Sequence, residues 1–386
     1  MGKKIRFGPG FLITAAFIGP GTVTSASFAG ASFGFALLWV VIISGFLAFV
    51  LQEMSGRFSL KKRKDLSQVL METTESRVVN IFFTLVAVLA IVIGAAAYEA
   101  GNITGAFIGL DGIYPMGKFW AVLIALIALA FLWGGRYRGI EVFLIGLVAL
   151  MSFAFIATAI KAGPSLPGIL KGFIPRFPEG SRPIATALLG TTVVPYNLFL
   201  YSSVVLKRWT RDDVWEMRRD LGISIALGIV ITASIVVTSA AAFFASGIKI
   251  DSAATMAIQL RPLLGKFAQQ TFCLGLFAAG LSSAITAPYA AAWLLRGVFK
   301  FNEKSYVFKI SSSVIVIFGL LSVFFPINPL QLIILAQIAN GLILPLVVFY
   351  LGYTILKEDK NPYQLLVLIF SFVLVLLVVF SKLFSL

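Results

Sequence analysis

The sequence predicts an all-α protein that crosses a membrane many times and has two helices broken in mid-membrane. Three observations lead to this fold class. Of the 386 residues, 59% are hydrophobic and only 12% are charged, with a mean hydropathy of +0.99, whereas a soluble domain carries about 25% charged residues. Apolar stretches long enough to span a bilayer recur along the chain. Glycine and proline interrupt two of these stretches.

Eleven apolar segments are expected to form membrane-spanning helices, because one crossing needs about 20 apolar residues. They are 11–34, 36–56, 79–109, 118–134, 140–161, 184–206, 221–246, 269–298, 306–325, 329–354 and 363–385. The polar stretch 65–76 is expected inside. The proline- and glycine-rich stretch 163–182 is expected as an outside loop, and so is 247–266, with a short helix over 253–264.

The basic residues indicate how the spans are oriented. With the N-terminus inside, 22 of the 31 Lys and Arg residues fall in inside segments, in agreement with the positive-inside rule. Eleven spans then put the C-terminus outside, in a bacterial inner membrane. The basic residues form short clusters between apolar spans and no single stripe, so the net charge of +15 does not indicate nucleic-acid binding.

Several residue types are too scarce for other functions. The lone cysteine, Cys273, excludes an internal disulfide, and the absence of histidine removes the commonest neutral metal ligand. No glycine-rich loop ends in Lys-Ser/Thr, so no nucleotide site is expected. We therefore expect neither an enzyme nor a cofactor. The first apolar run carries Gly-Pro breaks and is followed at once by a second span, which favours a retained helix over a signal peptide.

The two breaks lie in the first span, over Ile18 to Ser25, and in the sixth, over Gly190 to Asn197. Proline removes a backbone donor, and the freed backbone groups must be satisfied by protein or by a bound solute. Paired breaks five spans apart fit two inverted repeats of a transporter. These would be residues 11–162 and 184–354, with an eleventh helix at 363–385, in a single transport domain over 1–386.

Ionisable residues inside a membrane are candidates for function. Glu53 lies near the inner end of the second span, and Glu99 and Asn102 share one helical face of the third. A carboxylate at this depth can carry a proton or neutralise a cation. Glu141 and Asp220 lie beside arginines at span ends and are interpreted as members of interfacial charged clusters.

Neutral polar residues mark two later spans. Gln337 and Asn340 lie three residues apart in the tenth span, where they either line the pathway or hold helices together. The eighth span carries three hydroxyls among small residues, which fit either close helix packing or a cation site facing the first break. These are Ser282, Ser283 and Thr286.

Several stretches resemble the NRAMP family of proton-coupled divalent-metal transporters, over essentially the full length. They are Gly-Pro-Gly at 19–21, GASFGFALLW at 30–39, LQEM at 51–54, YEAGNITGA at 98–106, PYNL at 195–198, Ala-Gln at 336–337 and Leu-Pro at 344–345. The resemblance implies the LeuT-type fold, with ten core helices in two inverted repeats and helices 1 and 6 broken.

The same resemblance implies that the family's metal ligands are replaced here. The family binds metal through the Asp and Asn of an Asp-Pro-Gly-Asn stretch and the Met of a Met-Pro-His stretch. The corresponding positions here are Gly19, Thr22 and Val194, and the family's histidine position is Tyr196. Manganese and iron sites use carboxylate, imidazole or thioether ligands, whereas these residues and the neighbouring Thr24 and Thr192 offer only hydroxyls and carbonyls.

The residues favour a secondary transporter with a central site at Gly19, Thr22, Thr192, Val194 and Tyr196. Three substrates fit: a hydrated hard ion such as magnesium, a small polar organic solute such as an amino acid, or a monovalent cation, with sodium at the eighth-span hydroxyls. We expect a cation, magnesium-like rather than manganese or iron.

Proton or sodium coupling is expected to run through Glu53, Glu99 and Asn102, with Gln337 and Asn340 lining the route. Glycines such as Gly30 are expected to permit close helix packing. A channel or a transport-inactive sensor with the same fold is the alternative class.

Overall fold

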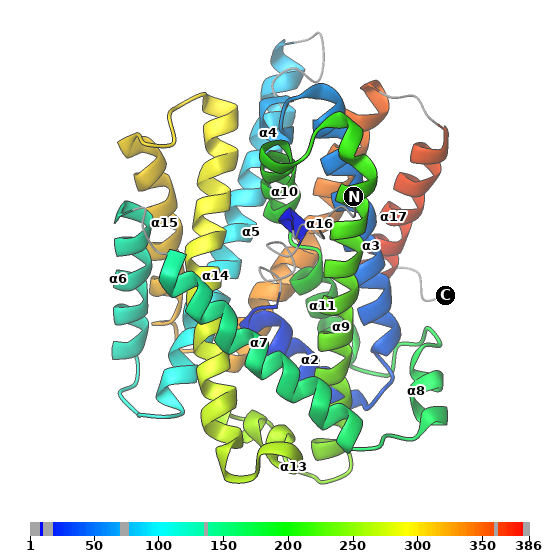
Figure 1. The fold of residues 1–386 in the computed structure, drawn as a ribbon, viewed down its shortest axis with the longest axis vertical. Helices are drawn as coiled ribbons and strands as arrows, with labels where there is room; N and C mark the ends of the chain where they lie inside the picture. The colour runs from blue at the N-terminus through cyan, green and yellow to red at the C-terminus, as the bar shows by residue number, and fades with distance from the viewer. Residues whose placement is uncertain (1–7, 11–17, 70–76, 135–137, 359–361, 381–386) are drawn as a thin grey trace, which may run out of the picture.

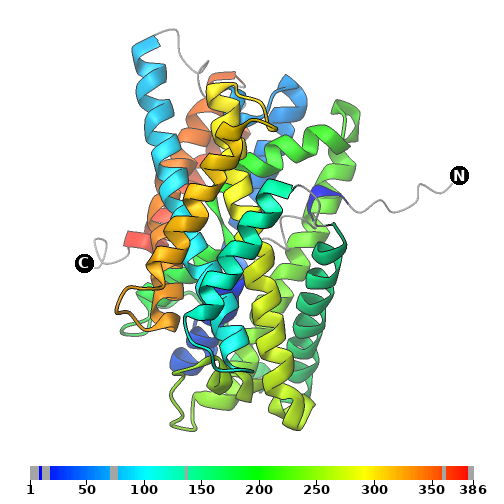
Figure 2. The same cartoon turned by 90° about the vertical axis from the view of Figure 1, so that its left-hand side faces the viewer.

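The computed structural model describes residues 8–10, 18–69, 77–134, 138–358 and 362–380. The long helices run roughly parallel to one axis of the molecule (Figures 1 and 2). The helices are α2 (Pro20–Phe33), α3 (Leu38–Lys62), α4 (Leu66–Val69), α5 (Arg77–Asp111), α6 (Phe119–Gly134), α7 (Arg138–Lys161), α8 (Leu166–Gly172), α9 (Arg182–Thr192), α10 (Pro195–Arg208), α11 (Val214–Phe243), α12 (Ala253–Met256), α13 (Arg261–Leu264), α14 (Ala268–Phe299), α15 (Tyr306–Ser322), α16 (Pro329–Glu358) and α17 (Pro362–Phe380), with 3-10 turns η2 (Arg211–Asp213), η3 (Ala257–Leu260) and η4 (Gly265–Phe267).

The described helices agree with the predicted spans from the second onward. Seven helical stretches are long and apolar enough to cross a membrane, and α6, α15 and the described core of α17 are shorter apolar helices. The first predicted span is described from residue 18 onward, and α2 covers its second half. Two loop predictions need correction. The stretch 163–182 contains the short helix α8, and the helix predicted over 253–264 is divided into α12, η3 and α13.

The predicted break in the sixth span is present, and the first span, described from residue 18 onward, is non-helical up to Gly19. Gly19 is extended (φ −111°, ψ −173°) and Pro20 opens α2. In the sixth span α9 ends at Thr192, Val194 is extended (φ −84°, ψ 119°), and Pro195 opens α10. Proline fits the first helical position because its missing N–H would lack an intrahelical partner there. Thr22 to Ser25 and Gly190 to Thr192, predicted as part of the breaks, are helical.

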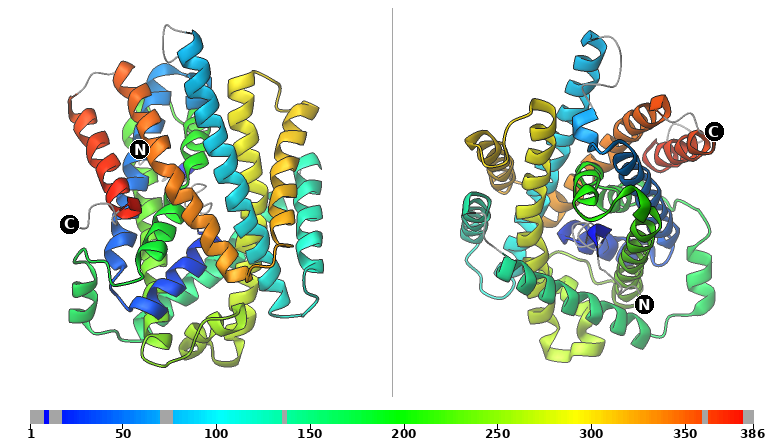
Figure 3. Two further views of the ribbon diagram at one scale, coloured as in Figure 1. Left: turned by 180° about the vertical axis from the view of Figure 1, so that it is seen from behind. Right: turned by 45° about the horizontal axis from the view of Figure 1, so that its top comes forward.

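The interior is built around α5, which packs most extensively on α14 and α16 and also contacts α15. Helix α2 packs extensively on α11, and α16 also packs on α9. Figure 3 shows α16 beside α5 from behind, and its right panel shows α6 and α15 on one flank and α17 on the other. This arrangement surrounds the two breaks with α5, α14 and α16.

Segments predicted to lie on one side of the membrane lie at one end of the molecule. In Figure 1, α4 and the connections from α10 to α11 and from α14 to α15 are at the top, whereas α8 and α13 are at the bottom. The first group contains segments predicted inside, and the second contains segments predicted outside. The structure therefore agrees with the predicted alternation, and the assignment of one end to the cytoplasm stays a prediction from charge.

Gly30 on α2 permits the closest approach to α11. A Cβ on Gly30 would overlap the Val236 carbonyl oxygen and lie 2.8 Å from the Ala240 nitrogen. Both are backbone atoms of a packed helix and cannot move aside alone. By contrast, a Cβ on Gly146 of α7 would meet no atom within 4 Å.

We therefore expect Gly30→Ala to destabilise the protein by about 1–3 kcal/mol, because it forces α2 and α11 apart. Gly146→Ala is the matched control and should be neutral or slightly stabilising, because alanine favours helix. Thermal unfolding of the purified protein in detergent measures both. Equal stabilities of the two variants would contradict the close packing of α2 on α11.

Candidate functional site

The two broken helices meet through a pair of threonines. Thr22 lies in the first turn of α2 and Thr191 in the last turn of α9, and their hydroxyl oxygens are 2.8 Å apart. Both side chains are buried. The Thr191 carbonyl has no amide partner four residues on, because residue 195 is proline. This contact joins two segments 169 residues apart and puts a carbonyl without its usual intrahelical donor beside the first break.

Two tyrosines from different helices meet next to this threonine pair. The rings of Tyr98 on α5 and Tyr196 on α10 are 5.6 Å apart, edge to face. Thr191 also hydrogen-bonds the Tyr98 side chain. Both tyrosines are buried, at 0% and 2% exposure. The central site is therefore lined by aromatic faces and hydroxyl groups.

Oxygen atoms surround the face of Gly19 where a side chain would lie. The position of a Cβ on Gly19 is 3.3 Å from the Ser283 Oγ, 3.7 Å from the Tyr98 hydroxyl and 4.0 Å from the Asn102 Oδ1. All three side chains are buried to 97% or more. A carboxylate at position 19 would therefore extend into a group of polar oxygens.

Glu99 is held by Asn102 on the same helix. The Asn102 Nδ2 donates to the Glu99 Oε2 at 3.2 Å, and Glu99 has no exposed surface. Its side chain packs on Gly319 of α15, where a Cβ would lie 2.6 Å from the Glu99 Cγ. Among the described residues the second carboxylate oxygen has no hydrogen-bond partner. The predicted pairing of Glu99 with Asn102 is thus formed.

Gln337 and Asn340 on α16 face α5. The Gln337 amide lies where a Cβ on Gly21 would overlap it, and its Nε2 is 3.2 Å from the Cβ position of Gly101. Asn340 packs on Gly94, with its Oδ1 2.9 Å from the Cβ position there. Gln337 therefore reaches the first break, whereas Asn340 lies farther along the α5–α16 interface.

Two hydroxyl groups that were predicted at the site, those of Thr192 and Thr286, bond carbonyls of their own helices. The Thr192 hydroxyl donates to the Leu188 carbonyl of its own helix at 2.9 Å, and Thr191 contacts the first break instead. On α14 the Thr286 hydroxyl donates to the Ser282 carbonyl at 2.9 Å, and Ser283 is the residue that faces Gly19.

The sequence analysis missed Thr191 and Tyr98 as site residues. One signal could have found Thr191: it lies four residues before Pro195, so its carbonyl cannot accept the usual intrahelical hydrogen bond. Tyr98 immediately precedes Glu99, and nothing in its local pattern indicates the direction of its side chain.

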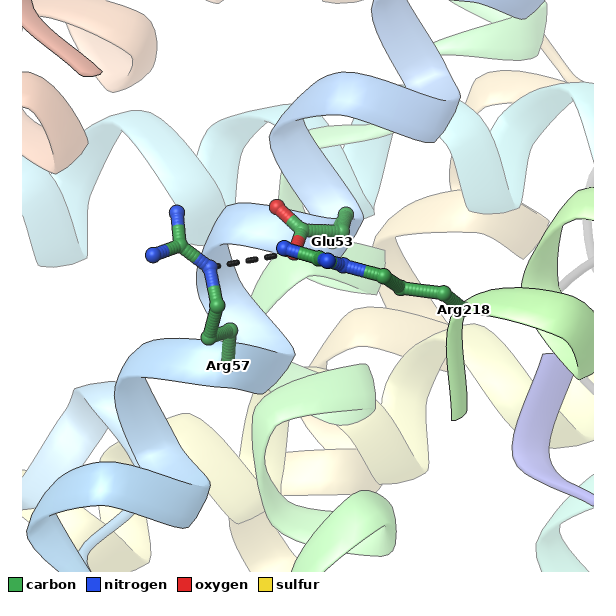
Figure 4. A network of polar contacts seen from close by, with 3 residues as sticks. All are labelled: Glu53, Arg57 and Arg218. Carbon is green, nitrogen blue, oxygen red and sulfur yellow. Dashed lines mark hydrogen bonds and ion pairs between the residues drawn. The ribbon is translucent and has the colours of Figure 1, made fainter. Parts of the chain in front are cut away.

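Glu53 lies in a separate ion-pair network with two arginines. Its Oε1 accepts from the Arg57 Nε at 3.0 Å and from the Arg218 Nε of α11 at 2.7 Å. Figure 4 shows the carboxylate between the two guanidinium groups. The structure therefore does not bring Glu53 together with Glu99, and it ties the last part of α3 to the first part of α11.

Asp220 has a more specific role than the predicted charged cluster. Its carboxylate accepts from the backbone N–H of Gly8 at 2.8 Å and of Gly10 at 2.7 Å, more than 200 residues away. The side chain is 7% exposed. Asp220 thus fixes the segment before the first break to α11. The side chain of Glu141 lies outside the described residues.

The described part of the chain has no group of three or more His, Cys, Asp or Glu side chains that could hold a metal ion. The central site offers neutral oxygens instead, and the Glu99 carboxylate is linked to them through its hydrogen bond with Asn102. Such donors suit hard cations with partial hydration shells better than soft transition metals.

Comparison with known proteins identifies related chains. A family model described as natural resistance-associated macrophage protein-like matches residues 10–386. A divalent metal cation transporter MntH from Nostoc is 30% identical over 92% of this chain and 85% of its own. A natural resistance-associated macrophage protein 2 homolog from Dictyostelium discoideum is 27% identical over 95% of this chain, which spans 61% of that protein.

A crystal structure of a variant of the Eremococcus coleocola manganese transporter is similar to this fold. The TM-score is 0.78 at 18% sequence identity, over 99% of this chain and 88% of that one. This likeness shows that the all-helical, LeuT-type architecture with two broken helices is shared.

The Glu53 network predicts energetic coupling between α3 and α11. In a double-mutant cycle, Glu53→Gln and Arg218→Gln should couple by about 1 kcal/mol, because the ion pair is partly buried. Arg219→Gln is the matched control, since Arg219 is adjacent and makes no ion pair with Glu53. Thermal unfolding measures all variants, and equal coupling for both arginines would argue against the observed pair.

Proposed function

Since this chain belongs to the natural resistance-associated macrophage protein-like family, we propose that it is a secondary transporter that moves a divalent metal cation across a membrane. The family match over residues 10–386 and the MntH relatives support cation transport. The two breaks, which meet at Thr22 and Thr191, supply a site between helices that can move apart in an alternating-access cycle.

The preferred metal in this proposal is magnesium or a similar hard ion. The observation that carries it is Gly19, which stands where the family has a carboxylate and is surrounded by hydroxyl and amide oxygens. Magnesium releases its water reluctantly and usually keeps several water ligands, through which neutral oxygens can contact it. Manganese and iron are bound better by carboxylate, imidazole or thioether groups, which Thr22, Val194 and Tyr196 do not supply.

The coupling of transport to a proton or a second cation is assigned to Glu99 and Asn102. Glu99 is fully buried, and its one described hydrogen bond comes from Asn102, whose other amide atom faces Gly19. A proton or a coupling cation can neutralise a carboxylate in this position. Glu53 is less suited to this role because two arginines already balance its charge. Gln337 and Asn340 are assigned to the lining of the route.

Transport of a small polar organic solute is the second candidate. The edge-to-face pair of Tyr98 and Tyr196 favours it, since aromatic faces beside hydroxyls bind such solutes well. No ionisable ligand is needed in that case.

A bacterial inner membrane with the N-terminus inside is the proposed location, supported by the apolar helices and the distribution of Lys and Arg. The whole chain would act as one transport domain without enzymatic activity.

Uptake into proteoliposomes tests the metal and the coupling carboxylate. We expect saturable magnesium uptake that exceeds manganese uptake, and a loss of about tenfold or more in Glu99→Gln, because the buried charge is removed. Glu53→Gln is the control and should retain most of the uptake. The absence of uptake of either metal, with saturable uptake of a polar organic solute, would reject the metal proposal.

A single substitution should restore transition-metal binding. Gly19→Asp brings a carboxylate to the family's ligand position, and the extended backbone of Gly19 accepts any residue. We expect manganese to bind about tenfold more tightly or better, because a carboxylate is a preferred manganese ligand. Gly19→Asn has nearly the same size without the charge. If calorimetry gives equal manganese affinities for both variants, position 19 does not contact the transported ion.

A further inference from the structure

Two basic side chains converge on one tryptophan at the end of the molecule that carries the α10–α11 and α14–α15 connections, at the top of Figure 1. The Lys207 Nζ of α10 lies 4.3 Å from the centroid of the Trp293 ring, and the Arg296 Cζ of α14 lies 4.2 Å from it. Tryptophan is the aromatic residue that attracts a cation most strongly. We name these three residues the basic tryptophan cluster.

The two cations of this cluster repel each other and lack a negative partner. Both distances end on one ring centroid, so the charges are no farther apart than the sum of the two distances, which is within the Debye length of about 10 Å at 0.1 M salt. Neither cation forms an ion pair with a described residue. Glu303, the acidic residue closest in sequence to Arg296, accepts from the Tyr289 hydroxyl at 2.6 Å instead. A bound anion would therefore relieve this repulsion.

The indole N–H of Trp293 is a third donor in the cluster. Trp293 is 6% exposed, and its Nε1 is buried without a hydrogen-bond acceptor among the described residues. An indole can only donate, so only an acceptor atom can satisfy it. The faces of an aromatic ring are electronegative and its edge is electropositive, so cations fit the faces and an anion fits the edge. A negatively charged group with acceptor oxygens therefore matches the cluster, and it can approach from the side of the exposed Lys207.

The surroundings of the cluster favour an anionic lipid over a small soluble anion. Phe299 follows Arg296 by three residues on α14, so the two share one side of the helix, and Phe299 is 60% exposed. Helix α15 begins nearby, because its Phe308 packs with Trp293 in one apolar group, and its first residue, Tyr306, is 74% exposed. Exposed apolar side chains beside paired cations fit a molecule with a charged headgroup and acyl chains. Basic pockets between helices on the cytoplasmic side of a membrane bind such headgroups.

We propose that the basic tryptophan cluster binds the phosphate of an anionic phospholipid, such as phosphatidylglycerol, at the membrane surface at this end of the molecule. Lys207 and Arg296 contact the phosphate oxygens, and the Trp293 N–H is a further donor to them. Phe299 and Tyr306 lie beside the acyl chains. This site is separate from the residues around the two breaks, and its partner is not the proposed cargo.

The lipid contacts two helices that have different places in the fold. Lys207 lies in the last turn of α10, which follows the break in the sixth span, and Arg296 lies in the last turn of α14. The two helices pack on each other. A ligand that contacts both favours conformations in which they stay together, so the lipid regulates the movement of α10. This regulation rests on the proposed function, whereas lipid binding does not.

Thermal unfolding of the purified full chain with added lipid tests the binding. The delipidated protein in a neutral detergent is titrated with short-chain phosphatidylglycerol or with phosphatidylcholine of the same chain length. A ligand that binds the folded state alone stabilises it in proportion to ln(1 + [ligand]/Kd). We expect a saturable rise of the melting temperature with phosphatidylglycerol and a constant melting temperature with phosphatidylcholine, which carries no net charge. Equal responses to the two lipids overturn the proposal.

A soluble phosphate ester distinguishes a lipid from a free anion. Glycerol 3-phosphate carries the anionic phosphate without acyl chains. We expect it to leave the melting temperature unchanged at the concentration at which phosphatidylglycerol saturates. A response equal to that of phosphatidylglycerol overturns the assignment to a lipid.

Substitutions then locate the site. Lys207→Gln and Arg296→Gln each remove one cation and should raise the Kd for phosphatidylglycerol by about fivefold or more. Trp293→Phe keeps a ring and removes the N–H, and it should raise the Kd by a smaller factor. Arg63→Gln is the matched control, since Arg63 is exposed, follows α3 at the same end of the molecule and has no contact with the cluster. Equal effects of Arg63→Gln and Arg296→Gln indicate general attraction to a basic surface and overturn the site.

Failure of this inference can be distinguished from failure of the proposed function. Stability that does not respond to phosphatidylglycerol, together with Glu99-dependent magnesium uptake, removes the lipid site and leaves the metal transporter. Lipid binding that is weakened in Arg296→Gln, without uptake of any divalent metal, keeps the lipid site and rejects the metal as substrate.

Discussion

A helix that ends inside an apolar layer leaves backbone N–H and C=O groups that lipid cannot satisfy, and this constraint governs the centre of the molecule. Pro20 and Pro195 each open a helix where no intrahelical donor is required. The Thr22–Thr191 contact then joins the two breaks at 2.8 Å. The surrounding helices α5, α14 and α16 keep the freed groups away from lipid, so the fold can keep polar backbone at its centre.

The negative charge linked to the central site is carried by Glu99 on α5 and not by a residue of the first break. No carboxylate lies among the three atoms nearest to a Cβ on Gly19, and Glu99 is linked to that position through the Asn102 amide. In the proposed function, an ion at the break would therefore contact neutral oxygens and lie farther from the negative charge. This arrangement favours ions that keep part of their hydration or carry a single charge, in contrast to a site where a carboxylate binds the metal directly.

Contacts at long sequence separation hold one end of the molecule around this centre. The Asp220 carboxylate binds the backbone of Gly8 and Gly10, and Glu53 binds Arg218 of the same helix α11. Helix α11 also packs along α2. It is thus connected to Gly8 and Gly10 on one side of the first break and to α2 on the other.

The sequence by itself determined the membrane spans, both breaks and the pairing of Glu99 with Asn102, because each follows from local rules. These rules are the length of an apolar run, the missing N–H of proline and the 3.6-residue period. Tertiary structure decided that the Thr191 hydroxyl, and not the Thr192 hydroxyl, contacts the first break, and that Ser283 is the hydroxyl residue facing Gly19. It also decided that the Asp220 carboxylate holds the N-terminal segment. A rotation of about 100° separates adjacent residues on a helix, and only the packing of distant helices fixes which of two neighbouring hydroxyls faces the site.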